Sequence, residues 1–284
     1  MINKLCVIGI GLIGGSIARA LKEAEYVGHV TAVGRDVAHL ERAVELGVAD
    51  SFETSIAKAS ADADVIIVAV PVGAMKPVFA ELSGVIKSDA VITDVGSVKG
   101  NVVRDARAAL GDKLACFVPG HPIAGTEKSG VEASFAELFR GQRVILTPLE
   151  ETSAVATETI NKMWQATGAD VESLSVEHHD EVLAATSHLP HVLAYTLVDT
   201  LAKMHEHREI FQFAAGGFKD FTRIASSDPQ MWHDICLNNR DALLDVLKSF
   251  TDDINKLTAA IENNDSEFIL KLFKRAKTAR DQNC

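Results

Sequence analysis

Short apolar segments alternate with stretches of helical periodicity along the first half of the chain. The apolar segments lie at residues 5–10, 30–33, 64–70, 91–94, 114–118 and 143–147. Strands that are apolar along their whole length are typical of a parallel sheet with helices on both faces, because neither face of the sheet then meets water. The pattern therefore predicts an α/β domain around one parallel sheet, with an amphipathic helix that follows the first strand and ends at Ala24.

From about residue 175 the periodicity becomes almost entirely helical. Pro190 interrupts the first apolar stripe, and because proline lacks an N–H and collides with the preceding turn, we expect the helix to kink or break near His188. This stripe comprises Val182, Leu189, Leu193, Leu197, Leu201 and Met204. A later stripe with heptad spacing comprises Leu243, Leu247, Phe250, Ile254, Leu257 and Ile261. Such a seam packs against another helix of the same chain or of a second subunit, and we favour a homodimer through this region.

The first helix opens on three glycines in the pattern GxGxxG, namely Gly9, Gly11 and Gly14. After a strand, the first glycine allows a tight turn, the second lets the backbone approach a pyrophosphate, and the third lets helix and strand pack closely. The phosphates would lie on the helix N-terminus. A glycine turn without a ligand is the alternative, and we favour a Rossmann-type NAD(P) site. The residues expected to form it are Gly9, Gly11, Leu12, Ile13, Gly14, Gly34, Arg35, Asp36, Val70 and Pro71.

The end of the second predicted strand bears on the choice between NAD and NADP. An NAD site usually carries an acidic residue about 20 positions past the glycines, bonded to the ribose 2′-hydroxyl. Counting from Gly14, this place falls on Gly34, which leaves room for a 2′-phosphate that Arg35 could pair with. Asp36 would serve the ribose if the loop were shifted by two residues. The spacing favours NADP.

Composition and charge limit the possible partners. The 284 residues include 28 basic and 39 acidic side chains, so the net charge of −11 argues against nucleic acids or anionic membranes as partners. The length predicts two domains, residues 1–174 and residues 175–284, and no apolar run approaches the roughly 20 residues that span a bilayer. Four cysteines lack metal spacing, with Cys6 and Cys116 in predicted strands, which indicates reduced thiols in a cytoplasmic protein.

Four histidines lie within 14 positions of one another: His178, His179, His188 and His191. No cysteine or carboxylate completes a tetrahedral metal site at a familiar spacing, and Pro190 breaks the helical register between the last two. We therefore expect no metal. The adjacent His178 and His179 would point to different faces of a helix, and we interpret them as solvated or packed.

The run GHPIAGTEKSG, at residues 120–130, places His121 in a rigid, turn-rich segment. The near-neutral pKa of histidine suits it to take a proton from a hydroxyl while a hydride leaves the same carbon. A turn histidine bonded to the backbone is the alternative. The dinucleotide-binding pattern that precedes it favours the chemical role.

Five sequence blocks resemble the TyrA family of prephenate, arogenate and cyclohexadienyl dehydrogenases over essentially the whole chain. They are GIGLIGGS at the start, TDVGSVKG at residues 93–100, GHPIAGTEKSG, ATSHLPH at residues 185–191 and GGFKDFTRIA at residues 216–225. Five blocks in the family's order are far more specific than a shared Rossmann fold. The resemblance implies that a hydroxyl-bearing cyclohexadiene carbon gives a hydride to NAD(P)+, the ring loses CO₂, and aromatisation yields 4-hydroxyphenylpyruvate or tyrosine.

The resemblance also implies roles for individual side chains. His121 matches the catalytic histidine, and Ser97 matches the serine that orients it and the nicotinamide, a role compatible with capping a helix before Val98. Arg223 matches the arginine that anchors the ring carboxylate, and Asp220 could pair with it on one helix face and hold or gate it. The other matches to substrate-binding positions are Ser187, His188 and Trp232, the last an aromatic that a second subunit could contribute.

The side chain of the substrate separates the remaining alternatives. Prephenate carries a keto group where arogenate carries an ammonium, so an acidic partner such as Glu127 would favour arogenate, whereas Ser187 and His188 suit a keto acid. We expect a prephenate dehydrogenase that tolerates arogenate; an arogenate or dual-specificity cyclohexadienyl dehydrogenase is the alternative. Another Rossmann β-hydroxy-acid dehydrogenase and a non-catalytic NAD(P)-sensing regulator are more remote. Since we expect no regulatory domain, inhibition by tyrosine would act at the active site.

Overall fold

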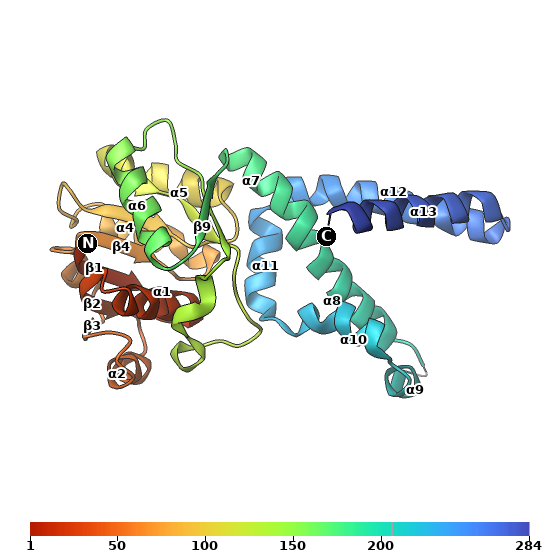
Figure 1. Ribbon diagram of the computed structural model, residues 1–284, viewed down its shortest axis with the longest axis horizontal. Coiled ribbons are helices and arrows are strands. Elements are labelled where there is room, and N and C mark those ends of the chain that lie inside the picture. The colour runs from red at the N-terminus through yellow and green to blue at the C-terminus, as the bar shows by residue number, and fades with distance from the viewer. Residues whose placement is uncertain (206, 284) are drawn as a thin grey trace. The chain divides into compact units, whose positions relative to one another are not determined.

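The computed structural model describes residues 1–205 and 207–283, and it consists of two compact units, Met1–Arg240 and Asp241–Cys284 (Figure 1). The predicted boundary between residues 174 and 175 falls inside the first unit. The helical region expected from residue 175 onward is therefore divided between the two units, and the predicted domain boundary stays a prediction.

A six-stranded parallel sheet in the order β3-β2-β1-β4-β5-β6 forms the centre of the first unit. Its strands are β1 (Ile2–Ile8), β2 (Val27–Val33), β3 (Ser51–Glu53), β4 (Val65–Val68), β5 (Val91–Asp94) and β6 (Phe117–Val118). This is the strand order of dinucleotide-binding folds, in which the order reverses between β1 and β4. The prediction of an N-terminal Rossmann-type parallel sheet is confirmed.

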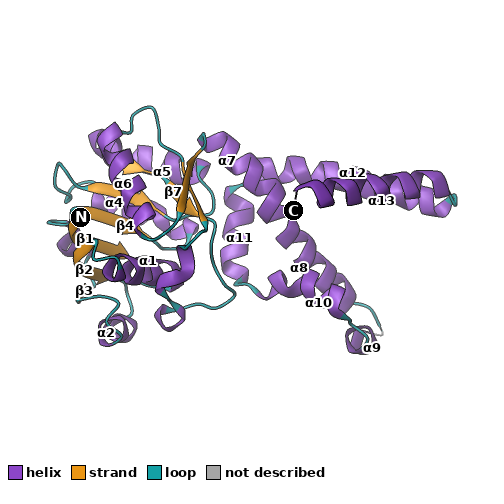
Figure 2. Ribbon diagram, in the orientation of Figure 1, coloured by secondary structure: helices purple, strands orange, loops and turns teal. Residues whose placement is uncertain are grey.

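Alternate residues of β1 enter two separate hydrophobic cores, because successive side chains of a strand point to opposite faces. Leu5 and Val7 pack in one core with α1, α2 and α6, whereas Cys6 and Ile8 pack in the other with α3, α4 and α5. Figure 2 shows the strands among the helices that flank them. These helices are α1 (Leu12–Glu23), α2 (Val37–Glu45), α3 (Ile56–Ser60), α4 (Met75–Leu82), α5 (Gly100–Leu110) and α6 (Ala154–Ala166).

Three further strands form a separate small sheet: β7 (Gly120–Pro122), β8 (Arg143–Leu146) and β9 (Asp170–Ser173). Because β8 pairs antiparallel with β7 and parallel with β9, the prediction that residues 143–147 join the main parallel sheet was wrong. The partners were missed because β7 is a three-residue strand that begins with glycine and ends with proline, and β9 is largely exposed. The turn predicted around His121 was also wrong at that residue, which lies on β7 opposite Ile145.

The segment at residues 114–118, predicted as a strand, is mostly a 3₁₀-helix, η2 (Gly111–Cys116), which ends where β6 begins. Cys116 therefore lies outside the sheet. Within the described part of the chain, Cys6, Cys116 and Cys236 are free thiols, and Cys284 lies outside it. The other 3₁₀ segments before residue 174 are η1 (Val72–Ala74), η3 (Val131–Ala133) and η4 (Ala136–Phe139).

The turn between β1 and α1 requires glycine at two of the three motif positions. Gly9 has a φ of +97°, and a Cβ added there would lie 2.6 Å from the carbonyl oxygen of Ala69. A Cβ on Gly14 would lie 2.3 Å from the carbonyl oxygen of Gly9. Gly9 and Gly14 therefore have the turn and packing roles predicted for them. A Cβ on Gly11 would meet nothing within 4 Å, so open space lies beside its backbone.

The rest of the first unit is helical. Its elements are α7 (Val176–Leu183), the π-helical η5 (Ala184–His188), α8 (Leu189–Ala202), α9 (His207–Gln212), α10 (Gly216–Thr222), the 3₁₀-helix η6 (Arg223–Ser226) and α11 (Pro229–Asn238). The break predicted near His188 takes the form of η5, which ends at this residue. Pro190 then lies in the first turn of α8, where its missing N–H is tolerated.

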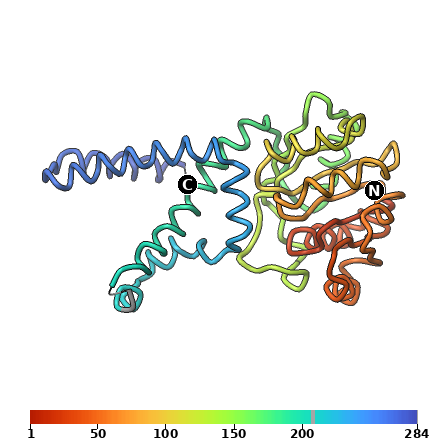
Figure 3. The backbone as a smooth tube through the Cα atoms, turned by 180° about the vertical axis from the view of Figure 1, so that it is seen from behind, coloured from red at the N-terminus to blue at the C-terminus, as the bar shows by residue number. Residues whose placement is uncertain are grey.

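Two helices, α12 (Arg240–Glu262) and α13 (Ser266–Asn283), account for the second unit and run in opposite directions (Figure 3). The turn between them includes Asn264, which has a φ of +53°. Of the predicted heptad seam, Leu243 is buried, whereas Ile254 and Ile261 are 43% and 59% exposed. An apolar stripe that stays partly exposed has surface left for another helix. Across the described residues, every helix is too short or too polar to cross a membrane.

Candidate active site

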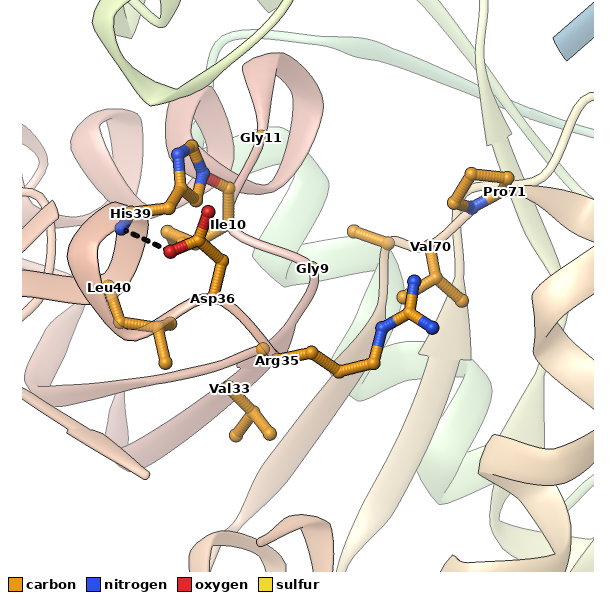
Figure 4. A pocket seen from close by; sticks show the side chains of 12 residues that line it. Gly9, Ile10, Gly11, Val33, Arg35, Asp36, His39, Leu40, Val70 and Pro71 are labelled. Carbon is orange, nitrogen blue, oxygen red and sulfur yellow. Dashed lines mark hydrogen bonds between the residues drawn. The ribbon is translucent and has the colours of Figure 1, made fainter. Parts of the chain in front are cut away.

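A cleft of about 560 Å³ opens at the carboxyl ends of β1, β2 and β4, beside the glycine turn (Figure 4). An open α/β sheet binds its ligands at this end of the strands, where the strand order reverses. The predicted cofactor residues that line the cleft are Gly9, Gly11, Gly34, Arg35, Asp36, Val70 and Pro71. Leu12, Ile13 and Gly14 lie in the first turn of α1 and are not part of the lining.

The N-terminus of α1 fits a phosphate group. Among the described residues, its N-cap Gly11 has no side-chain capping hydrogen bond, and its first turn contains no acidic residue. The first N–H groups of the helix and the positive end of its dipole are therefore not engaged by the chain's own side chains. Together with the open space at Gly11, these features fit the pyrophosphate of a dinucleotide.

Arg35 and Asp36, at the end of β2, point in different directions. The Asp36 carboxylate caps α2, accepting hydrogen bonds from the backbone N–H of Ala38 at 3.0 Å and of His39 at 3.3 Å. Figure 4 shows the Arg35 side chain extending toward Val70, away from the Asp36 carboxylate. Arg35 is exposed, and no ion pair within the described part of the chain engages it. Its charge is therefore available to an anion in the cleft.

His121, on β7, belongs to a buried polar cluster that includes α7. Its Nδ1 atom lies 2.9 Å from Nε2 of His179, and Nδ1 of His179 lies 2.8 Å from Oδ1 of Asp180. His179 is wholly buried, whereas His121 is 8% exposed. No described residue forms a hydrogen bond with Nε2 of His121. A carboxylate and two imidazoles thus form a chain that ends on Nε2 of His121, which has no partner among the described residues.

A buried ion pair holds the backbone next to His121. The side chains of Lys99 and Asp94 are both 0% exposed and pair with each other. Nζ of Lys99 also donates to the carbonyl oxygen of Gly120 at 2.7 Å, and Oδ1 of Asp94 accepts from the N–H of Gly120 at 3.2 Å. Burial lowers the pKa of Lys99, and the charge of Asp94 opposes this shift. Both backbone groups of Gly120 are thereby held at the end of β5, which fixes where His121 begins.

Asp180 also caps helix α5. Its two carboxylate oxygens accept hydrogen bonds from the backbone N–H groups of Lys99 and Gly100, each at 2.8 Å. A carboxylate is favourable at this place because it meets the unpaired N–H groups and the positive end of the helix dipole. The interpretation of Ser97 as a helix cap was wrong, because α5 begins at Gly100 with Lys99 as its N-cap. The capping side chain comes instead from 80 residues further along the chain.

A second group of rings lies on α8, η5 and α11. The buried His188 has Nδ1 3.0 Å from Nδ2 of Asn239, and its Nε2 is buried without a partner among the described residues. Trp232 stacks on His191 of the same chain with 3.6 Å between ring centroids, and its Nε1 is also buried without a described partner. The carbonyl oxygen of Ser187 lies 2.9 Å from Nδ1 of His191. The predicted residues His188, Ser187 and Trp232 are therefore brought together.

The half-buried Ser97 lies in the loop between β5 and α5. The next residue, Val98, is fully buried and packs in one hydrophobic cluster with Trp232 and Ile235 of α11. The backbone of Ser97 lies close to the ring of His188 and partly opposes the lowering of its pKa by burial. The structure thus places Ser97 beside the group of rings on α8, η5 and α11.

Arg223 and Glu127, both predicted to bind substrate, face one another. Nη1 of Arg223 lies 3.8 Å from Oε2 of Glu127, and the two side chains are 66% and 50% exposed. The predicted pairing of Asp220 with Arg223 was wrong. Helix α10 ends at Thr222, and Arg223, which starts the 3₁₀-helix η6, pairs with Glu127 and forms no ion pair with Asp220 among the described residues. An exposed pair at this distance contributes little to stability, about 0–1 kcal/mol, and is readily exchanged for another partner.

Burial keeps the three clustered histidines neutral. It lowers the pKa of His121 well below its ordinary value, and His179, Lys99 and His188 lower it further. Burial also lowers the pKa of His179 and brings that of His188 to about 4, although Asp180 opposes both shifts. A neutral imidazole has one nitrogen that donates and one that accepts, so His121 is in the charge state of a general base near pH 7.

Five polar residues of this site were not predicted from the sequence: Asp94, Lys99, His179, Asp180 and Asn239. His179 was interpreted as solvated or packed; it is packed, but hydrogen-bonded to His121, while His178 is exposed. The triplet HHD at residues 178–180 was the available signal, since a carboxylate next to a buried histidine commonly orients its ring. Among residues 1–205 and 207–283, no group of three or more His, Cys, Asp or Glu side chains could hold a metal ion.

Two family models match the chain, one after the other. The nucleotide-binding domain of prephenate dehydrogenase matches residues 17–173, and the dimerization domain of prephenate dehydrogenase matches residues 175–275. Together they cover the part of the cleft lining from Val33 to Pro71 and the helices that carry Arg223 and Trp232.

Individual proteins resemble the chain over nearly its full length. Cyclohexadienyl dehydrogenase of Zymomonas mobilis is 41% identical, over 98% of this chain and 95% of that protein. Prephenate dehydrogenase of Bacillus subtilis is 38% identical, over 99% of this chain and 76% of that protein. The crystal structure of prephenate dehydrogenase from Aquifex aeolicus, in complex with hydroxyphenyl propionate and NAD+, superposes with a TM-score of 0.92 at 38% identity, covering 99% of this chain and 98% of that one.

Proposed function

Because the chain belongs to the prephenate dehydrogenase family, we propose that it catalyses the NAD(P)-dependent oxidative decarboxylation of prephenate to 4-hydroxyphenylpyruvate. The observation that carries the proposal is the neutral, buried His121, whose Nε2 has no partner among the described residues. Gly120 anchors it to the carboxyl end of β5, and β5 is the neighbour of β4, whose end lines the dinucleotide cleft. A base placed here suits a substrate that loses a hydride and a proton from the same carbinol.

His121 accepts the hydroxyl proton of the substrate in this reaction. As the carbinol carbon gives up a hydride, its hydroxyl becomes acidic, and the neutral imidazole takes the proton. The carbon–carboxylate bond breaks at the same ring, and its electron pair completes the aromatic system as CO₂ leaves. When bound, the oxidised nicotinamide supplies the hydride acceptor. Ser97, in the loop after β5, is proposed to orient His121 and the nicotinamide.

Arg223 is proposed to anchor the ring carboxylate by a forked, charge-assisted pair of hydrogen bonds. To do so, it must exchange Glu127 for the substrate, and the 3.8 Å distance and exposure of their pair make this exchange inexpensive. At the other end of the substrate, the unpartnered Nε2 of His188 and Nε1 of Trp232 suit a polar group. With the neutral His188 there, we propose that the keto acid prephenate is preferred and arogenate tolerated.

The family and the fit of the cleft support a nicotinamide dinucleotide as the cofactor, and we propose NADP over NAD. Gly34 occupies the place of the usual ribose-binding carboxylate, and Asp36 already caps α2. Arg35 would pair with the 2′-phosphate. The cofactor bound in the Aquifex aeolicus structure is NAD+, so the nicotinamide class has direct support from a relative, whereas the preference for the phosphate rests on Arg35 alone.

We also propose a homodimer through the helical region, supported by the match to a dimerization domain and by the exposed Ile254 and Ile261. The division at residues 174 and 175 is supported by the two family models, which meet there. A cytoplasmic location, the absence of a metal and inhibition by tyrosine at the active site remain proposals from the sequence.

Purified protein should reduce NAD(P)+ in the presence of prephenate and release CO₂ in equal amounts. Absorbance of the reduced cofactor, with both substrates and both cofactors side by side, gives the four values of kcat/KM. We expect prephenate to be preferred. A preference for arogenate above about tenfold, or some 1.4 kcal/mol in transition-state binding, would contradict the assignment of substrate, and no turnover of either would contradict the function.

His121→Asn should lower kcat by roughly 10²–10⁴, the usual contribution of a general base, with little change in the Kd of cofactor or substrate. In the unaltered enzyme, kcat/KM should persist as pH falls through about 6.5, the ordinary histidine pKa, because the pKa of His121 is lowered and the base stays unprotonated. An unchanged kcat in the variant would place the base elsewhere. It would also be the result expected of a nucleotide-sensing regulator.

Arg223→Ala should weaken substrate binding by roughly 2–5 kcal/mol, the usual cost of removing one partner of a buried charged hydrogen-bonded pair. The effect should be found in KM and in the Kd of a substrate analogue measured by calorimetry. Glu127→Gln is the matched control, because it removes the competing partner of the same arginine and should leave KM unchanged or lower it. A KM that rises equally in both variants would show that the pair supports the loop and does not anchor the carboxylate.

Arg35→Ala should raise KM for NADP+ at least tenfold and leave KM for NAD+ nearly unchanged, since only NADP+ carries the phosphate that the guanidinium would bind. Steady-state kinetics with each cofactor at saturating substrate measures both values. Lys22→Ala, which removes a cation of the same unit that does not line the cleft, is the control. Equal losses with NAD+ and NADP+ would remove the basis for proposing NADP.

A further inference from the structure

We propose that His179 and Asp180 fix the tautomer of His121, so that its Nδ1 carries the proton and its Nε2 presents a lone pair to the substrate hydroxyl. The proposal rests on the proposed function and adds two positioning residues to it. Neither residue would bind the substrate, because both ring nitrogens of His179 and both carboxylate oxygens of Asp180 already form hydrogen bonds within the chain.

The carboxyl group of Asp180 is ionised. It accepts the backbone N–H of Lys99 on one oxygen and that of Gly100 on the other, each at 2.8 Å. Burial raises the pKa of Asp180, but the hydrogen bonds from His179 and from these two N–H groups outweigh burial, so its pKa is lowered. An ionised carboxylate can only accept hydrogen bonds, so Nδ1 of His179, 2.8 Å away, must be the donor.

The tautomer of His179 then decides that of His121. Burial lowers the pKa of His179, as does Lys99, and the ring is neutral near pH 7. A neutral ring that donates from Nδ1 can only accept at Nε2. Nδ1 of His121 lies 2.9 Å from this nitrogen, so it must carry the proton that the hydrogen bond needs. Nε2 of His121 is left as the acceptor, and no described residue occupies it.

The charges around the pair favour this single arrangement. Lys99 and His188 face His121 from the loop after β5 and from η5, and both disfavour its protonation. Asp94 and Asp180 face His179 from β5 and α7 and favour its protonation, but burial outweighs them. If His179 were protonated, it would donate to Nδ1 of His121 and move the proton of that ring to Nε2, which would abolish the base. Protonation of His179 at low pH should therefore lower the activity.

Replacement of His179 separates this role from a merely structural one. His179→Leu removes the acceptor for Nδ1 of His121, whereas His179→Gln can present an amide oxygen near the place of Nε2. We expect kcat to fall about 10²-fold or more in the leucine variant, with KM and cofactor Kd within about threefold of the unaltered enzyme; loss of the tautomer-fixing carboxylate in serine proteases costs about 10⁴. The glutamine variant should recover at least tenfold of the loss.

His178→Leu is the matched control. His178 is the neighbouring histidine on α7, it is exposed, and among the described residues its ring pairs with Glu181 alone, at 3.8 Å, so kcat of this variant should be unchanged. If His179→Leu retains full kcat, or if the glutamine variant is no better than the leucine variant, the proposal is wrong. Wild-type protein that turns over neither prephenate nor arogenate would instead contradict the proposed function.

Nitrogen-15 NMR of the unaltered protein tests the proposal without turnover. Two-bond nitrogen–proton correlation spectra of ¹⁵N-histidine-labelled protein distinguish protonated from bare ring nitrogens, and His121→Asn identifies the His121 signals. We expect Nδ1–H and a bare Nε2 for His121 at pH 7, with the same pattern in His179. A proton on Nε2 of His121 would overturn the proposal even if the enzyme is active.

Discussion

The carboxylate of Asp180 is the interaction on which the geometry of the site depends. One of its oxygens accepts from both the backbone of Lys99 and the ring of His179, and the other accepts from the backbone of Gly100. The same carboxylate thus completes the start of α5 in the Rossmann region and orients a histidine on α7. Because the start of α5 also carries Lys99, which holds Gly120, the backbone and the ring of His121 are positioned by groups that meet at one point.

The buried ion pair of Lys99 and Asp94 contributes more to the position of Gly120 than to the stability of the fold. The desolvation of a pair such as Lys99 and Asp94 offsets much of its attraction, whereas removing one partner of a buried pair costs about 3–5 kcal/mol. The pair is therefore weak evidence for stability but a strong constraint on position. Its two contacts with Gly120, from Lys99 and from Asp94, hold the residue before the proposed base from both its N–H and its carbonyl. This ion pair therefore positions His121 through Gly120, and the charge of its Lys99 also helps to keep the His121 ring neutral.

The sequence was informative where the physical cause is local. The glycine motif, the first four apolar strands and the break before Pro190 each depend on residues within a few positions of one another, and the structure bears them out. The hydrogen bond between His121 and His179 joins residues 58 positions apart, and the cap of α5 comes from 80 positions away. No periodicity or spacing reports such contacts, because they arise only when β7 and α7 have packed. The pairing predicted for Asp220 failed for the opposite reason. Its helical spacing from Arg223 could be read from the sequence, but helix α10 ends between the two residues.

At one end of the proposed substrate site the base is already held in place, whereas at the other end the arginine would first have to change its partner. The base is buried, neutral and held by hydrogen bonds that leave one nitrogen bare, so little reorganisation is needed at the reacting atom. Arg223, the proposed anchor, is exposed and paired with Glu127, which it would have to release. A rigidly held base favours the rate of proton transfer. In a protein of net charge −11, an anionic substrate needs a local cation, and Arg223 would supply it by exchanging Glu127 for the substrate carboxylate. In the proposed mechanism this exchange comes first, and proton transfer to Nε2 of His121 follows.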